Sequence, residues 1–133
     1  MKTIGELEQY LGVIRAAAVS QDKKDILRAK EYIEKHYMEN LSLNVLAEEI
    51  HMNPYYFSSF FKKSTGENFK DYVNRIRVRH ALPLLISTDM KTYEIAEKVG
   101  FGEVRIFNAA FQKIYQETPG SYRRRVSSGS EGE

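Results

Sequence analysis

Lysine and arginine side chains are concentrated in one part of this 133-residue chain, and their charge is the first indication of its chemistry. Residues 51–126 contain thirteen Lys and Arg against seven Asp and Glu, a net charge of +6, whereas residues 1–50 carry seven against nine, or −2. Glu131 and Glu133 bring the total to +2. Cations concentrated in one part of a nearly neutral chain favour a polyanionic partner. The alternative is that they form a solvated helix face that binds no partner.

The remaining reactive side chains form no catalytic or metal-binding pattern. Cysteine is absent, which excludes disulfides and thiolate metal sites and suggests a reducing compartment. His36, His51 and His80 are far apart in the sequence and lack a carboxylate or cysteine at ligand spacing. Glu94 and Glu97 share a helix face, but no nucleophile or phosphate-binding loop accompanies them. We therefore expect no catalysis, no metal and no cofactor.

The bulk composition sets the size and the compartment. A hydrophobic content of 42% in 133 residues suffices for one compact domain or for two small subdomains that share a helix. No apolar run approaches membrane-spanning length, and the N-terminus has no apolar core of the signal-peptide type. We expect a cytoplasmic protein without a membrane partner.

A long, half-buried helix is predicted for the stretch Phe69–Thr88. Its apolar residues recur at steps of three, four or one and share a broad face, while three arginines fall largely on the other face. Asn68 is a suitable N-cap. Pro83 is predicted to kink the helix or to begin its end, because proline cannot donate a backbone hydrogen bond.

The sequences on the two sides of this helix resemble each other, which makes the helix a spacer. Leu46–Ile50 is followed by Phe57 and Phe61, and Ile95–Val99 is followed by Phe107 and Phe111. The offset between the copies is 49 residues before the turn at residues 100–103 and 50 residues after it. Two copies of one helical unit are the simplest interpretation.

Each copy is predicted to be a helix-turn-helix unit, in which a short helix, a tight turn and a second helix follow one another. The first unit, about residues 43–65, has helices at 45–51 and 54–64, because Asn53-Pro54 is a strong helix start and Gly66 a stop. The second unit, about residues 93–116, has helices at 93–99 and 103–115, with Thr92 as a cap and Gly100 as a left-handed stop.

Segments outside the repeat complete the prediction. A helix is expected at residues 4–18, followed by a polar break at Val19–Asp22 and a second helix at Lys23–Tyr37. Residues 1–22 are interpreted as a linker helix or the tail of a preceding domain, and residues 23–126 as the repeated domain. A last short helix starts at Thr118-Pro119, and residues 127–133 are expected to be disordered.

The order of these motifs resembles the AraC-type (AraC/XylS) helix-turn-helix DNA-binding domain over residues 29–125. The resemblance is carried by the string Ile95–Phe101, by the pair Phe107 and Phe111, and by Thr118-Pro119 followed by Tyr122-Arg123. The lead-in with Tyr32-Ile33, Tyr37, Leu41 and Leu43 resembles the members that are C-terminal output domains of two-component response regulators.

The resemblance implies an all-α fold with two helix-turn-helix subdomains joined by the long connecting helix, plus an extra N-terminal helix. It also implies sequence-specific binding of double-stranded DNA for transcription regulation, with two recognition helices in successive major grooves. RNA polymerase and an upstream receiver or ligand-binding domain would be further partners.

The same resemblance supplies the candidate site. The recognition helices would be Pro54–Ser64 and Glu103–Tyr115. The base-facing positions would be Tyr55, Ser58, Ser59, Lys62, Arg105, Ile106, Asn108 and Ala109. The phosphate contacts would be Lys63, Arg75, Arg77, Lys113, Arg123, Arg124 and Arg125.

The segment Gly102–Ile106 departs from the pattern of that family, and so do two single residues. Ala109 stands where an arginine is usual, and Pro83 stands where a good helix former is usual. The second unit could therefore read DNA differently from the first. The alternative of another class is a helical interaction module whose basic face meets an acidic protein, and such a module would retain no DNA in a gel shift at low salt.

Overall fold

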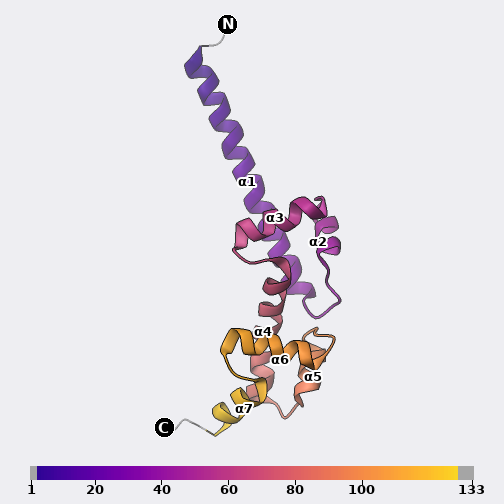
Figure 1. The fold of residues 1–133 in the computed structure, drawn as a ribbon. Coiled ribbons are helices and arrows are strands. Elements are labelled where there is room, and N and C mark those ends of the chain that lie inside the picture. Colours follow the sequence, from indigo (N-terminus) through magenta and orange to yellow (C-terminus); the bar gives the residue numbers. More distant parts are fainter. Residues whose placement is uncertain (1–2, 129–133) are drawn as a thin grey trace.

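The computed structural model describes residues 3–128, apart from the side chains of residues 16–20, and every element in that part is an α-helix (Figure 1). The helices are α1 Ile4–His36, α2 Leu43–Glu49, α3 Pro54–Thr65, α4 Phe69–Ser87, α5 Thr92–Lys98, α6 Val104–Tyr115 and α7 Pro119–Ser127. The predicted all-α class is confirmed. Of the tail predicted to be disordered, Ser127 belongs to α7, and residues 129–133 lie outside the described part.

The predicted break at Val19–Asp22 is wrong, because α1 runs without interruption from Ile4 to His36. No Gly or Pro stands in that stretch, and its polar residues are compatible with a helix. Gln21 Nε2 donates to Asp25 Oδ1 over 3.0 Å, a bond between residues one turn apart. Thr3 begins the helix with a capping box, in which its hydroxyl accepts from the Glu6 backbone N–H at 3.1 Å.

The first helix-turn-helix unit consists of α2 and α3. Ser42 caps α2, and its hydroxyl accepts from the Val45 N–H at 3.1 Å. Asn53 caps α3 through its side-chain oxygen, which accepts from the Tyr55 N–H at 2.9 Å, and Pro54 is the first helical residue. Gly66 ends α3 in the left-handed conformation, with φ of 83°. The helix start predicted at Asn53-Pro54 and the stop predicted at Gly66 are confirmed.

The connecting helix α4 begins after the Asn68 cap, whose side chain accepts from the Asp71 N–H at 2.8 Å. The helix continues past Pro83 to Ser87, so the proline does not end it at once. The second unit, α5 and α6, follows. The N-cap of α5 is Lys91 and not the predicted Thr92, which is its first helical residue.

Two hydrophobic cores divide the molecule, and α4 belongs to both. The first core joins α1, α2, α3 and the first half of α4 around Ile33, Leu46, Phe57, Phe61 and Ile76. The second core joins the second half of α4 to α5 and α6 around Val78, Leu85, Ile95, Phe107 and Phe111. The side chain of Tyr37 packs against both cores. The arrangement therefore consists of two small bodies that share one helix.

Arg77 connects the two bodies, and we call the following set of contacts the Arg77 clasp. The guanidinium Nε donates to the Tyr37 carbonyl at 2.7 Å, and another guanidinium nitrogen donates to the Glu39 carbonyl at 2.9 Å. The same group lies 5.8 Å from the centre of the Phe101 ring. Burial lowers the pKa of Arg77, as expected for a cation partly removed from water. The phosphate contact of Arg77 stays a prediction, and two of its guanidinium donors serve backbone carbonyls of the same chain.

Gly100 completes the Arg77 clasp from the second unit. Its φ of 106° lies in the region that favours glycine, and a Cβ placed on it would lie 2.5 Å from the Tyr37 carbonyl oxygen and 2.8 Å from Arg77 Nε. The backbone of the turn between α5 and α6 therefore lies so close to the backbone after α1 that residue 100 has no room for a side chain.

A second contact joins α1 to α4 beside the clasp. Glu34 accepts hydrogen bonds from Arg79 and, at 3.1 Å, from His80, whose ring stacks on Tyr37 with centroids 4.1 Å apart. Partial burial alone would raise the pKa of Glu34, but the hydrogen bonds from His80 and Arg79 outweigh it and lower the pKa. The end of α1 is thus tied to the middle of α4.

The Arg123 side chain forms hydrogen bonds at the C-terminal end of α4. Its guanidinium nitrogens donate to the carbonyls of Leu85 at 2.9 Å, Met90 at 2.6 Å, Leu84 at 3.2 Å and Thr88 at 3.2 Å. Two of these carbonyls belong to the last turn of α4, which has no further helical turn to satisfy them. The phosphate contact of Arg123 stays a prediction, while its side chain caps α4 and holds α7 against it.

We expect Gly100→Ala to lower the free energy of unfolding by at least about 2 kcal/mol more than Gly66→Ala. Both glycines have positive φ, but a Cβ at Gly66 has no heavy atom within 4 Å, so that variant carries only the conformational cost of about 1 to 2 kcal/mol. Urea denaturation of both variants measures the difference. Equal losses would show that the close approach at Gly100 contributes nothing.

We expect Arg123→Met to cost about 2 to 4 kcal/mol of stability, because several part-buried carbonyls lose a charged donor. The matched control is Arg124→Met, one residue away on an exposed side chain, with an effect within about 0.5 kcal/mol. Thermal unfolding of the two variants decides the matter. If Arg123→Met were as stable as the control, the capping role would be refuted.

Candidate nucleic-acid interface

The outward face of α3 carries polar and aromatic side chains. Tyr55 is 89% exposed, and Ser58, Ser59 and Lys62 are exposed as well. Their spacing of three, four and seven residues from Tyr55 places all four on one stripe. The opposite stripe is fixed in the first core, where the rings of Phe57 and Phe61 pack with their centroids 5.6 Å apart. The four predicted positions on α3 are therefore brought together.

The outward face of α6 is built in the same way but combines polar and apolar side chains. Arg105 has 79% of its side chain exposed and lies 3.4 Å from Glu103, while Asn108 and Ala109 are exposed beside it. Ile106 lies at the edge of this face and is only 37% exposed. On the inner side, Phe107 and Phe111 are fully buried in the second core.

One exposed position of α6 was missed by the sequence analysis. Gln112 is exposed and lies seven residues after Arg105, just as Lys62 lies seven residues after Tyr55. The signal was present, because the 50-residue offset that relates Phe57 to Phe107 also relates Lys62 to Gln112. The complete face of α6 therefore includes an amide that can both donate and accept hydrogen bonds.

The two faces are held on one frame. Figure 1 shows α3 and α6 one above the other along α4, each running across it. Besides the shared helix, Lys113 on α6 lies 3.6 Å from Asp71 at the start of α4, so α6 also touches the half of α4 that belongs to the first unit. The positions of the two faces relative to each other are thus determined by α4 and the Arg77 clasp.

The predicted phosphate contacts fall into three groups. In the described part of the chain, the side chains of Lys63 and Arg124 have no hydrogen-bond or ion-pair partner, which leaves their charges available. The charges of Arg75, Lys113 and Arg125 are paired with Glu67, Asp71 and Glu117 at 2.9 Å, 3.6 Å and 2.7 Å. Arg77 and Arg123 form the third group and are engaged with backbone carbonyls.

Two of these ion pairs, Arg75 with Glu67 and Arg125 with Glu117, also shift the pKa of one partner. The hydrogen bond with Glu67 raises the pKa of Arg75, and the hydrogen bond with Arg125 lowers the pKa of Glu117. Arg75 and Arg125 also lie over the rings of Tyr72 and Tyr122 at 4.9 Å and 5.3 Å. Their net contribution to a positive surface is smaller than the sequence suggests, because a carboxylate accompanies each cation.

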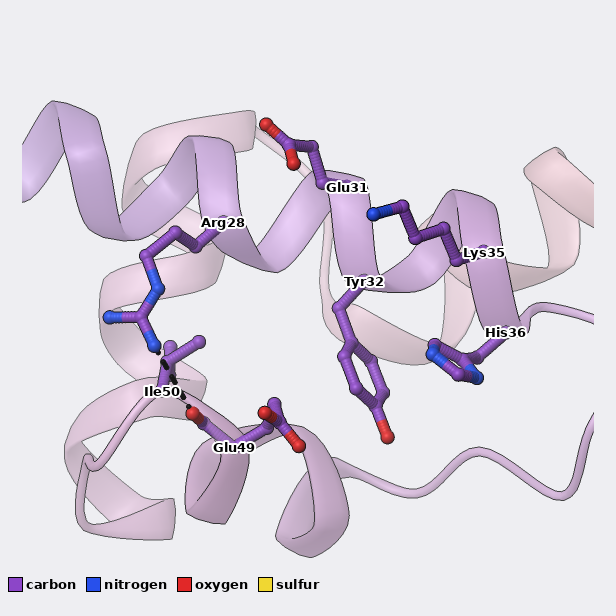
Figure 2. Close-up of a pocket in the computed structure, with 7 residues that line it drawn as sticks. All are labelled: Arg28, Glu31, Tyr32, Lys35, His36, Glu49 and Ile50. Carbon is purple, nitrogen blue, oxygen red and sulfur yellow. Dashed lines mark hydrogen bonds between the residues drawn. The ribbon is translucent and has the colours of Figure 1, made fainter.

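An open pocket of about 430 Å³ lies where α1 crosses the end of α2 (Figure 2). Figure 2 shows Arg28 reaching from α1 toward α2, where its guanidinium donates to the Glu49 carbonyl at 3.2 Å. The lining carries cations and carboxylates together.

In the described residues no group of three or more His, Cys, Asp or Glu side chains could hold a metal ion. The helices described here are also too short or too polar to cross a membrane.

Comparisons with known proteins agree with this geometry. A family model described as a helix-turn-helix domain matches residues 46–125. The regulatory protein PocR of Salmonella typhimurium is 37% identical over 103 residues, which are 77% of this chain and 34% of PocR. The uncharacterized transcriptional regulatory protein YesN of Bacillus subtilis is 41% identical over 96 residues, which are 70% of this chain and 26% of that protein.

A solved structure extends the likeness to three dimensions. The C-terminal domain of the two-component response regulator yesN from Fusobacterium nucleatum has 42% sequence identity and a TM-score of 0.67, and the match covers 71% of this chain and 93% of that domain. The chain spans about a third or less of the length of PocR and of the Bacillus YesN. With its two helix-turn-helix units on one connecting helix, the chain belongs to the AraC-type helix-turn-helix family of DNA-binding transcription regulators.

Proposed function

We propose that this domain binds double-stranded DNA sequence-specifically, with α3 and α6 as recognition helices in successive major grooves. The observation that carries the proposal is the matched pair of exposed faces on α3 and α6, which a single helix holds together. The nineteen residues of α4 make it about 28 Å long. That length is comparable to the repeat of about 34 Å at which the major groove returns to the same face of B-DNA.

The chemistry of α6 suits direct reading of base edges. An arginine at position 105 can donate two hydrogen bonds to guanine, and the amides of Asn108 and Gln112 can pair with adenine. Ala109 offers only apolar contact, such as with a thymine methyl group. Ile106, at the edge of the face, would extend this apolar contact.

The chemistry of α3 differs from that of α6. Ser58 and Ser59 present hydroxyl groups that can either donate or accept, and Lys62 can donate to guanine. Tyr55, at the first turn of α3, can reach a base or the sugar-phosphate backbone. The Asn53 cap leaves the Tyr55 N–H satisfied, which helps to hold the first turn in a defined position.

Phosphate binding is assigned first to Lys63 and Arg124, whose charges are free in the described part of the chain. Arg75, Lys113 and Arg125 can take part only if they exchange or share their carboxylate partners. Phosphate contacts position a protein on DNA without reading its sequence. Affinity and specificity should therefore be separable by mutation.

The relatives suggest a wider context for this domain. Because the chain is 42% identical to the C-terminal domain of a response regulator, we infer an upstream receiver or ligand-binding domain and RNA polymerase as partners. Sequencing the gene around this segment tests the first inference. Retention of RNA polymerase by the DNA-bound chain tests the second, and a failure to retain it would count against that contact.

We expect the affinity for DNA to fall steeply with salt, by roughly one logarithmic unit per logarithmic unit of salt for each phosphate contact. The double variant Lys63→Ala/Arg124→Ala should weaken binding to all sequences equally and reduce the slope by about two. The control is Lys24→Ala, which removes the same type of charge from an exposed site on α1. Fluorescence anisotropy over a range of salt concentrations measures both quantities, and an unchanged slope would refute the assignment.

We expect Arg105→Ala to relax specificity at one or two base pairs of the second half-site, by about 1 to 3 kcal/mol for the preferred base. The measurement is selection of bound sequences from a random DNA pool, for the natural chain and for the variant. The natural chain should select two half-sites about 10 base pairs apart, centre to centre. Ser58→Ala is the matched control, since it should affect only the first half-site.

Two results would contradict these assignments. A uniform loss of affinity with Arg105→Ala would show that this residue binds phosphate and does not read a base. Selection of a single half-site by the natural chain would show that only one recognition helix is used.

A further inference from the structure

A cleft of about 200 Å³ lies between α6 and the start of α4. Its lining includes Glu67, Asp71, Asn74 and Arg75 on the side of α4, and Ala110 and Lys113 on the side of α6. Ala110 and Lys113 directly follow Ala109 and Gln112, which belong to the outward face of α6. The cleft therefore borders the face of α6 that is assigned to a major groove.

Two ion pairs occupy this cleft. The Arg75 guanidinium donates through Nε to a Glu67 carboxylate oxygen at 3.0 Å, and a second guanidinium nitrogen lies 2.9 Å from the same oxygen. Lys113 Nζ lies 3.6 Å from an Asp71 carboxylate oxygen. Two cations thus face two carboxylates, and their charges cancel within the cleft.

The connection between α3 and α4 fixes the backbone of both acidic residues. The Thr65 hydroxyl accepts from the Glu67 N–H at 3.2 Å and donates to the Glu67 carbonyl at 3.0 Å. Asp71 stands in the first turn of α4, where its N–H donates to the Asn68 cap at 2.8 Å. The positions of these two backbone segments therefore do not depend on the ion pairs.

The ion pairs themselves are open to exchange. The exposed fractions of the four side chains run from 31% for Glu67 to 73% for Lys113. Ion pairs exposed to this degree contribute little to stability. A guanidinium binds phosphate with the same fork of donors that it uses for a carboxylate. A phosphate oxygen can therefore take the place of the Glu67 carboxylate on Arg75.

DNA would bring phosphates to this place. With α3 and α6 in successive major grooves, the sugar-phosphate backbone that separates the two grooves crosses the molecule between these helices. The cleft lies in that interval, because one wall belongs to α6 and Glu67 follows the Gly66 cap of α3. A phosphate in the cleft would meet donors from Arg75, Lys113 and the Asn74 amide, but it would also be repelled by any carboxylate that remains.

We propose that the cleft is a phosphate-binding site for the DNA backbone between the two half-sites, and that Glu67 and Asp71 lower the affinity for DNA by occupying its cations. This inference rests on the proposed function. A phosphate must either displace the carboxylates or lie beside them, and both cost binding free energy that a neutral side chain would not. Because phosphates carry no sequence information, the two carboxylates weaken binding to all sequences and leave a larger share of the affinity to base contacts.

The test removes the two negative charges and keeps the shape of the side chains. At about 0.1 M salt, Glu67→Gln/Asp71→Asn should bind both the selected operator and an unrelated duplex at least about threefold more tightly than the natural chain. The slope of affinity against salt should steepen by about one for each cation released. Fluorescence anisotropy measures both, and an unchanged affinity and slope would overturn the proposal.

The matched control is Glu8→Gln/Glu31→Gln, which changes the net charge equally at two exposed sites of α1. Its affinity for DNA should stay close to that of the natural chain. An equal gain in the control would show that only the total charge matters, and it would overturn the role of the cleft.

A double-mutant cycle shows whether the gain comes from the cation. Arg75→Gln should weaken binding little in the natural chain, where Glu67 already neutralises it, but it should remove the gain of Glu67→Gln. If the ion pairs only held α6 to α4, Glu67→Gln/Asp71→Asn would lower the denaturation midpoint and the affinity together. That result would also overturn the proposal.

The place of the phosphate is tested on the DNA. Methylphosphonate groups, which carry no charge, replace the phosphates either between the two half-sites or beyond their outer ends. The gain of Glu67→Gln/Asp71→Asn should vanish with the first duplex and persist with the second. A gain that persists with the first duplex would show that the cleft meets no phosphate there.

The two proposals fail in different ways. A natural chain that binds no DNA would overturn the proposed function and this site with it. A natural chain that selects two half-sites, with variants of Glu67 and Asp71 that bind no better than the control, would overturn only the inference about the cleft.

Discussion

The structure depends on the contacts of Arg77 with two backbone carbonyls. A guanidinium on α4 donates to Tyr37 and Glu39, which follow α1, while Gly100 brings the turn between α5 and α6 against the same atoms. Three segments far apart in the sequence therefore meet at one cation. Since a charged donor makes stronger hydrogen bonds than a neutral one, this clasp can restrict hinge motion between two cores that otherwise share α4 and the side chain of Tyr37. The contacts of the Arg77 clasp therefore help to set the angle between the two helix-turn-helix units.

Within each unit, aromatic packing and helix caps determine which side chains face outward. Phe57 and Phe61 in α3, like Phe107 and Phe111 in α6, occupy the inner stripe of their helices and leave the opposite stripe to polar residues. The units differ at their helix starts, because Asn53 caps α3 through its side chain whereas Glu103 makes no such bond at α6. The contact of Lys113 with Asp71 is a largely exposed ion pair near the other end of α6 and is worth little by itself. Two units of the same plan can thus differ in rigidity.

The sequence was informative where the physics is local or periodic. The caps at Asn53 and Asn68, the stop at Gly66 and the inner aromatic stripes follow from residue type and spacing, and all are found as predicted. Arg77 and Arg123 could not be distinguished from surface cations, because the carbonyls that accept their hydrogen bonds lie 33 to 40 residues away in the sequence. The periodicity of one helix does not indicate such distant contacts. The polar stretch at Val19–Asp22 resembled a linker, yet without Gly or Pro it continues the helix. Gln112 could have been found from the repeat alone.

We propose that one rigid frame holds the two recognition helices at a fixed distance on DNA. The most direct measurement is the affinity of the chain for its selected operator when base pairs are inserted between the two half-sites. A rigid frame predicts that insertions of about 5 and of about 10 base pairs both reduce binding to the level of a single half-site, because the units can neither rotate nor move apart by a full DNA turn. Binding that is unchanged by either insertion would show independently moving units and would contradict the account.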